Sequence, residues 1–191
     1  MLRWIVRALA LIVIAAATLV VLDFAELLVP VGPDDSASMA NTIPACDGRV
    51  LAQGLTYRFT DPSPDDVVAV HAAETDEGQI VPDPDADDRV LVLRVVGGPD
   101  DVVVGRAGTV FVNQQKFDDI TTKPFAAVTV PNEQYFLLGD NRSAAIDSRT
   151  FGPVLRDAIF AKVFAVDWPL RDITFRLGQF TGAPPGKIDC N

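Results

Sequence analysis

Short runs of β-branched and aromatic residues recur along most of this chain, and they constrain its fold more than any other feature. Turn-forming clusters such as Gly97-Gly98-Pro99-Asp100 and Pro131-Asn132 separate the runs. Such runs predict β-strands, because β-branched side chains pack well on a pleated surface. The expected strands cover residues 49–52, 66–71, 89–96, 102–104, 109–112, 127–130, 134–138, 158–166 and 173–176. No long segment of helical period follows residue 30, so the sequence predicts an all-β domain.

The N-terminal segment has a different pattern. From Ile5 to Leu22 the chain is apolar except for Arg7 and Thr18. This run, extended by snorkelling of Arg7, can form a single transmembrane helix. A cleaved secretory signal has the same basic and apolar regions, but bulky residues stand where its small-x-small cleavage site would lie. We therefore predict an uncleaved membrane anchor over residues 1–29 and a β-rich domain over residues 30–191, which begins with a Pro- and Gly-rich linker.

The distribution of charge predicts how the anchor is oriented. Arg3 and Arg7 are the only charged residues up to Leu22, and all 26 acidic residues follow it. By the positive-inside rule, the N-terminus lies in the cytoplasm and the domain lies outside the cytoplasmic membrane. The formal net charge of −10 argues against a nucleic-acid partner, because binding a polyphosphate requires a basic surface. After the anchor, enough chain remains for one domain with a substantial core.

The most acidic stretch runs from residue 72 to residue 88 and holds seven acids and no base. Asp83, Asp85 and Asp87 alternate as calcium ligands can, but the stretch lacks the glycine and the bidentate glutamate of an EF-hand loop. A solvated hairpin loop is the favoured interpretation. Two cysteines and one histidine provide no ligand set for a zinc site, so we expect neither a metal nor another cofactor.

Four further segments change how a serine-containing turn is interpreted. Alone, Ser36-Ala37-Ser38-Met39 would be a polar turn. It is followed in order by Asp65-Asp66-Val67-Val68-Ala69-Val70, Arg94-Val95-Val96-Gly97-Gly98-Pro99-Asp100-Asp101, Gly139-Asp140-Asn141-Arg142 and Asp147-Ser148-Arg149-Thr150-Phe151-Gly152-Pro153-Val154. In this order, behind one apolar segment, they resemble the sequence boxes of bacterial type I signal peptidases. The resemblance extends from the anchor to Trp168-Pro169-Leu170.

The resemblance implies a membrane-anchored serine endopeptidase. Such an enzyme removes signal peptides from exported preproteins on the outer side of the cytoplasmic membrane. Its fold would be a coiled all-β body whose apolar surface contacts the lipid bilayer, and we expect a monomer. In the family's mechanism, a lysine kept neutral by burial takes the proton of the nucleophilic serine.

The resemblance also implies a role for individual residues. Ser38, directly before Met39, matches the nucleophile, and Ser36 matches the hydroxyl that helps the Ser38 backbone N–H hold the oxyanion. Two supporting ion pairs are implied, between Arg94 and Asp140 and between Asp147 and Arg149.

The chain departs from the family at the general base. The dyad lysine would directly precede Arg94, but that position is Leu93. The serine that hydrogen-bonds the lysine is replaced by Ala145, and Asn41 and Gly98 also depart from the family pattern. If Leu93 and Ala145 lie side by side, they form an apolar patch, and neither side chain can act as a general base. The first hypothesis is therefore a signal peptidase working with a substituted base, and the alternative is an impaired or inactive homologue that binds signal peptides or partners without cleaving them.

No other residue clearly replaces the lysine. Arg94 should point to the opposite face of its strand from Leu93, and a guanidinium does not deprotonate in proteins. His71 is chemically competent but lies on the preceding strand, where an ordinary strand residue is the favoured interpretation. The resemblance places the remaining candidates away from the dyad: Lys116, Lys123, Lys162 and Lys187.

Two further alternatives concern the state of the cysteines and the class of protein. Cys46 and Cys190 both fall on the oxidising side of the membrane, where they could form a disulfide or remain as two free thiols. An autoproteolytic repressor-like domain would share the fold and a Ser-Lys dyad, but the anchor, the acidic charge and the lack of a DNA-binding module disfavour it.

Overall fold

The computed structural model describes residues 2–25, 28–30, 38–40, 42–43, 49–86 and 89–166. Its helices are α1 (Leu2–Ala25), α3 (Leu55–Phe59) and α4 (Ser148–Phe151), with a 3-10 turn at Arg156–Ala158. Its strands are β1 (Leu28–Pro30), β2 (Arg49–Gln53), β3 (Val67–Glu74), β4 (Ile80–Pro82), β5 (Arg89–Gly97), β6 (Val102–Arg106), β7 (Thr109–Val112), β8 (Gln115–Lys116), β9 (Phe125–Thr129), β10 (Gln134–Leu138), β11 (Val154–Leu155) and β12 (Ile159–Val166). The strand expected at residues 173–176 lies outside the described residues, as do Ser36, Asn41, Cys46, Cys190 and most of the linker.

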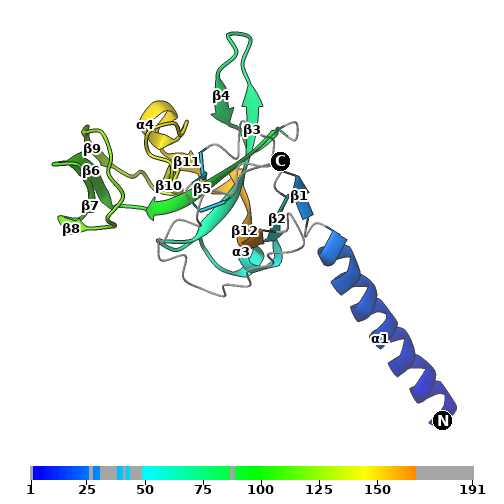
Figure 1. The fold of residues 1–191 in the computed structure, drawn as a ribbon. Helices are drawn as coiled ribbons and strands as arrows, with labels where there is room; N and C mark the ends of the chain where they lie inside the picture. The colour runs from blue at the N-terminus through cyan, green and yellow to red at the C-terminus, as the bar shows by residue number, and fades with distance from the viewer. Residues whose placement is uncertain are drawn as a thin grey trace.

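The described strands form two antiparallel sheets, so the fold is mostly β as the sequence predicts. The larger sheet has the order β1-β2-β12-β3-β5-β10-β11, with β4 paired to β3, and the smaller has the order β8-β7-β6-β9. Figure 1 shows the smaller sheet on one side of the body, reached from the end of β5. The two sheets approach closely there, since a Cβ on Gly97 would lie 2.7 Å from Cγ2 of Val103.

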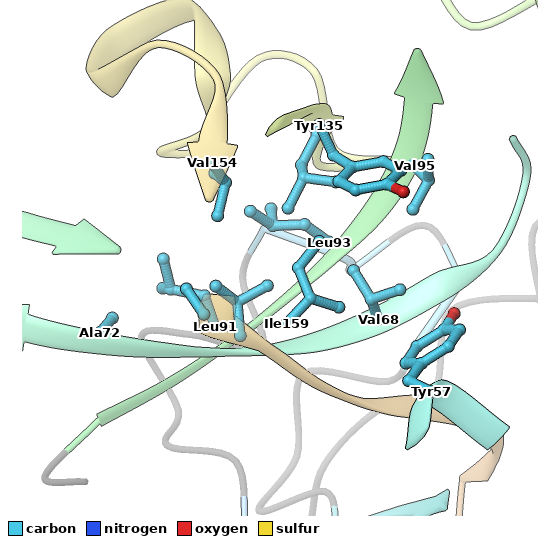
Figure 2. Close-up of a cluster of buried hydrophobic side chains, with 12 residues drawn as sticks. Tyr57, Val68, Ala72, Leu91, Leu93, Val95, Tyr135, Val154 and Ile159 are labelled. Atoms are coloured by element: carbon cyan, nitrogen blue, oxygen red, sulfur yellow. The ribbon is translucent and has the colours of Figure 1, made fainter. Parts of the chain in front are cut away.

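The two faces of the larger sheet bury different clusters of side chains. Alternate residues of β3 divide between the faces, as the period of a strand requires: Val68 and Val70 join one cluster, whereas Val67 and Ala69 join the other. Figure 2 shows the first cluster, which includes Leu93 from β5. A third cluster joins the smaller sheet to β5 and β10, and it consists of Val96, Val103, Val110, Val130, Phe136 and Leu138.

The first part of the acidic stretch, residues 72–82, forms a hairpin, as expected. Ala72 of β3 pairs with Pro82 and Glu74 pairs with Ile80, and the hairpin projects from the body in Figure 1. The structure also contains short elements that the sequence did not predict, including α3, α4 and the two-residue strands β8 and β11.

The first helix leads into the larger sheet through β1. α1 has 24 residues and extends away from the β body in Figure 1, and β1 then pairs with β2. Within the described residues, no helix meets the length and apolarity expected of a membrane span.

Candidate active site

Ser38 lies at the start of a tight turn that is anchored in the core. The backbone N–H groups of Thr42 and Ile43 both donate to the carbonyl oxygen of Met39, at 2.8 and 2.7 Å. Met39 itself is fully buried in the cluster on the Val67 face of the larger sheet. Because its neighbour is fixed in this way, Ser38 is held in a defined position and is 5% exposed.

The segment after β10 packs directly on Ser38. The N–H of Asn141 donates to the Ser38 carbonyl oxygen at 3.0 Å. A Cβ on Gly139 would lie 2.4 Å from that same oxygen and 2.4 Å from Cβ of Ala145. Only glycine fits a position where backbone and side chain approach this closely. Ser38 and Ala145 are therefore neighbours across Gly139, although 107 positions of sequence numbering separate them.

Leu93 lies on the strand beside this glycine. Leu138 of β10 pairs with Arg94, and Leu137 pairs with Val95, so the next step of the register brings Gly139 opposite Leu93. Directly opposed residues of an antiparallel pair share a face. Leu93 is fully buried in the cluster that Leu137 and Val95 also join. The positions predicted for the nucleophile, the base and its serine partner thus converge around Gly139, and the last two positions carry only hydrocarbon.

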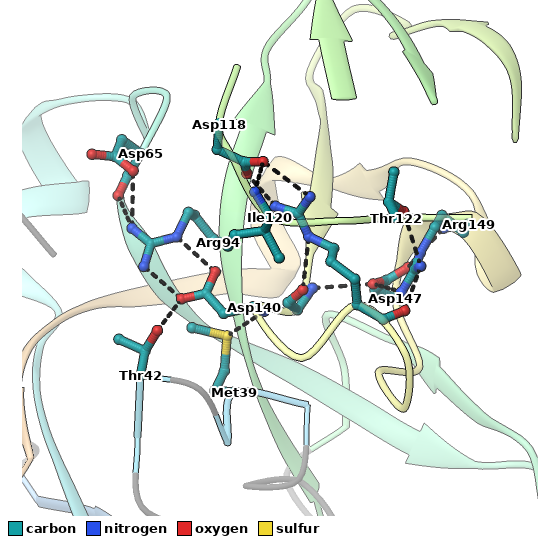
Figure 3. Close-up of polar contacts among 12 residues, drawn as sticks. Met39, Thr42, Asp65, Arg94, Asp118, Ile120, Thr122, Asp140, Asp147 and Arg149 are labelled. Carbon is teal, nitrogen blue, oxygen red and sulfur yellow. Dashed lines mark hydrogen bonds and ion pairs between the residues drawn. The ribbon is translucent and has the colours of Figure 1, made fainter. Parts of the chain in front are cut away.

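A buried ion pair connects the Ser38 turn to β5 and to the segment after β10 (Figure 3). Arg94 Nε donates to Asp140 Oδ1 at 2.8 Å, and Arg94 Nη2 donates to Oδ2 at 2.6 Å. Thr42 Oγ1 donates to the same Oδ2, and Asp65 accepts from Arg94 Nη1 at 2.9 Å. Burial opposes the charge on Arg94, but the hydrogen-bonded carboxylate of Asp140, followed by Asp65, outweighs it and raises the arginine pKa. Arg94 is a permanent cation that supports the site and cannot act as a base.

A second ion pair fixes Gly139 from the other side. Arg149 donates to both carboxylate oxygens of the fully buried Asp147, through Nε at 2.8 Å and Nη2 at 2.7 Å. Asp147 Oδ2 accepts the N–H of Gly139 at 3.1 Å, and Arg142 Nε donates to the Gly139 carbonyl at 3.0 Å. Both polar groups of the Gly139 backbone are therefore held by side chains, which orders the segment that contacts Ser38.

The smaller sheet contributes contacts that the sequence did not predict. Arg142 is 3% exposed and forms an ion pair with Asp118, from the loop after β8. Thr122, from the same loop, accepts from Arg149 Nη1 at 3.4 Å. A buried arginine requires a buried partner, but no local sequence signal identifies Asp118 rather than its neighbour Asp119. Thr42 was also missed, because its hydroxyl has a function only once Asp140 lies beside it.

His71 does not lie beside Leu93. It pairs with Val90 on β5, whereas Leu93 pairs with Val68, three residues or about 10 Å away along the strand. By alternation His71 also faces the opposite side of the sheet, where its ring packs on Phe160 with centroids 4.1 Å apart. Its Nδ1 atom is buried and has no hydrogen-bond partner. This environment favours the ordinary strand residue over the substituted base.

Two of the lysines considered as substitute bases form ion pairs with carboxylates. Lys116 is paired with Asp119 on the smaller sheet, and Lys162 Nζ lies 2.5 Å from Asp66 Oδ1. Asp66 also accepts from the hydroxyl of Tyr57 at 3.0 Å. Burial and then the negative charge of Asp66 raise the pKa of Tyr57, which keeps this phenol protonated. Lys187 lies outside the described residues.

The comparison with known proteins identifies the class to which this architecture belongs. The sequence model of the signal peptidase family, peptidase S26, matches residues 1–168. The chain therefore belongs to this family, and its relatives are type I signal peptidases.

Individual relatives are distant but cover most of the chain. The probable signal peptidase I-2 of Synechocystis sp. is 30% identical over 140 residues, which are 71% of this chain and 61% of the relative. The chain thus spans about three fifths of that relative's length. A signal peptidase I of Leptolyngbya laminosa is 30% identical over 155 residues, 78% of this chain and 71% of the relative. The crystal structure of a signal peptidase I from Enterococcus faecalis has 24% identity and a TM-score of 0.42, and the match covers 54% of this chain and 97% of the other.

Proposed function

We propose that this chain acts on the signal peptides of exported preproteins and contacts them at the Ser38 turn. Its relatives are named signal peptidases, which supports this substrate class. The observation on which the proposal depends is the convergence of Ser38, Gly139 and Ala145 beside the buried Leu93. The family's reacting groups would meet at this place.

β5 offers an edge on which an extended peptide could bind. β10 pairs with β5 from Arg94 to Gly97, and Gly139 follows it opposite Leu93. Residues 90–92 therefore have β3 on one side and, in the described part of the chain, no strand on the other. An extended peptide can add to such an edge as a further strand, through backbone hydrogen bonds. It would follow the line of β10 and reach Gly139 beside Ser38.

The proposal includes a membrane anchor. α1 bears large apolar side chains that are more than half exposed, namely Leu9, Leu11, Ile12, Val13 and Ile14. Exposed apolar residues in such density need a covering partner, and a lipid bilayer is the partner that an N-terminal helix with basic residues at its start would take. With this orientation, the β body lies outside the cytoplasmic membrane and Ser38 faces exported preproteins.

Under the peptidase hypothesis, the Ser38 hydroxyl attacks the scissile carbonyl, and the Ser38 N–H together with Ser36 stabilises the oxyanion. This step needs a group that takes the hydroxyl proton, because a positioned base contributes roughly 10²- to 10⁴-fold to the rate. Leu93 cannot take a proton, and the methyl group of Ala145 cannot orient a base. These two residues favour the second candidate function, in which the chain binds signal peptides without cleaving them.

The two functions are separated by measuring cleavage and binding on the same protein. Purified full-length protein in detergent would be incubated with a preprotein that has an Ala-x-Ala site, and binding of the labelled signal peptide would be followed by fluorescence anisotropy. Ser38→Ala is compared with Ser63→Ala, an exposed serine between α3 and β3. Cleavage that only Ser38→Ala abolishes supports the peptidase. Binding without cleavage supports the second candidate, and the absence of both refutes the proposal.

A further inference from the structure

The loop that connects β10 to α4 presents one large apolar side chain to solvent. Ile146 is 41% exposed. It follows Ala145, whose methyl group lies against Gly139, so it is one residue away from the atoms that define the candidate site. A single exposed isoleucine is common on protein surfaces and needs no explanation by itself. Ile146 differs because it lies close to the path that a bound peptide would follow.

The loop is rigid at both ends. On one side, Arg142 is buried and paired with Asp118; on the other, Asp147 is fully buried and paired with Arg149. Within the loop, the N–H of Ala145 donates to the Asn141 carbonyl at 2.9 Å and closes a turn. Ile146 is therefore held in place before any ligand arrives, which lowers the entropy cost of a contact with a ligand.

The register of β10 directs a bound peptide toward this loop. β10 ends at Leu138, opposite Arg94, and the residues that follow it form the loop. A peptide that occupies the open edge of β5 at residues 90–92 lies in line with β10. A peptide that runs parallel to β5 has its C-terminal end nearer to β10, and this end then passes over the segment from Gly139 to Ile146.

We propose that Ile146 is a specificity-determining residue, which contacts a side chain of the bound peptide just beyond Ser38 and selects an apolar residue there. This inference rests on the proposed function, since it requires that peptides bind along β5. The contact is apolar, and the chain supplies it from a preformed loop.

Peptide binding to the full-length protein in detergent tests the inference. The probes are labelled synthetic signal peptides that keep an Ala-x-Ala sequence and carry either Leu or Ser at each of the three positions after it. We expect the wild-type protein to prefer Leu at one of these positions, and Ile146→Ala to reduce that preference about 10-fold, the lower end of the discrimination that one methylene gives in an apolar site. The matched control is Leu155→Ala, because Leu155 is 50% exposed on β11 and the preference should then be unchanged.

Each outcome has a distinct meaning. Wild-type protein that binds none of the peptides refutes the proposed function together with the inference. Wild-type protein that binds them with no Leu preference, or with a preference that Ile146→Ala leaves intact, overturns the inference alone. A preference that both variants reduce equally also overturns it, because the effect would then not be specific to the loop.

Discussion

Replacing Leu93 with lysine tests whether this position is a site for a buried base. The leucine is fully buried, and it packs in the cluster that contains Val68, Val95 and Leu137. A lysine in such surroundings is desolvated, and full burial lowers a lysine pKa by as much as about 3–5 units. We therefore expect Leu93→Lys to fold with a neutral amine at pH 7 and to lose stability for that reason.

The size of this loss in stability follows from the proton that the amine gives up on folding. The unfolded lysine titrates near a pKa of about 10.4, and one pKa unit corresponds to about 1.36 kcal/mol. A lysine that is forced to be neutral at pH 7 thus costs up to about 4.6 kcal/mol of the free energy of unfolding. Between the lowered pKa of the folded state and 10.4, the unfolded chain binds more protons than the folded chain, so stability rises with pH in this window. Raising the pH from 7 to 9 should restore up to about 2.7 kcal/mol.

Urea unfolding of the full-length protein in detergent, followed by circular dichroism at several pH values, measures this dependence. Leu93→Met is the control, because a volume-conserving swap costs less than about 1.5 kcal/mol and introduces no titrating group. Subtracting the control at each pH removes the pH dependence of all other groups. If the two variants respond identically to pH, the introduced amine reaches solvent, and the argument that position 93 is a buried base site is wrong.

Three further predictions concern the groups around Ser38. Asp140→Asn should lower the free energy of unfolding by about 3–5 kcal/mol, because it removes the buried carboxylate and leaves the buried Arg94 guanidinium with only the exposed carboxylate of Asp65. Asp65→Asn, at the exposed partner of the same arginine, should cost about 0–1 kcal/mol; equal urea midpoints for the two variants would contradict this. Gly139→Ala should cost about 1–3 kcal/mol by overpacking and weaken signal-peptide binding, and unchanged anisotropy would count against the close approach. Asp118→Asn should lower the free energy of unfolding by about 1.5–3 kcal/mol, because Asp118 pairs with the buried Arg142. Asp119→Asn, at an exposed carboxylate, should lower it by less than about 0.5 kcal/mol. Equal melting temperatures of the two variants would contradict this.

Strand identity was predictable from local sequence because alternation is a local property. The apolar runs at residues 66–71 and 89–96 correspond to β3 and β5 in the structure. The same alternation separates His71 from Val68 and Val70, so its face could also have been derived before the structure was known. By contrast, β8 and β11 have two residues each and exist only through their partners. No local pattern predicts a strand of that kind.

The candidate site was predictable only as far as a family resemblance extends. Arg94 and Asp140 are 46 residues apart, and neither composition nor periodicity indicates that they meet. The resemblance supplied that expectation, but it supplied no partner for Arg142, because Asp118 lies in the loop of a separate sheet. Long-range ion pairs of this kind depend on how the sheets pack, which the sequence pattern of single strands does not determine.

If Leu93 and Ala145 replace the family's lysine and serine, as the resemblance implies, a double-mutant cycle can tie the two positions to each other. Ala145→Ser alone places a hydroxyl beside an apolar patch, where an unsatisfied polar group costs about 1–3 kcal/mol. Together with Leu93→Lys, the same hydroxyl can accept from the introduced amine, so the double variant should be more stable than the two single effects predict, with a coupling of about 0.5–3 kcal/mol. The double variant is also the form in which a positioned base returns next to Ser38. If the site is a peptidase that lost its base, preprotein cleavage should appear in the double variant and vanish when Ser38→Ala is added. A coupling near zero would mean that the side chains at positions 93 and 145 do not meet, and the proposal that these two positions correspond to the family's base and its serine partner would then be wrong.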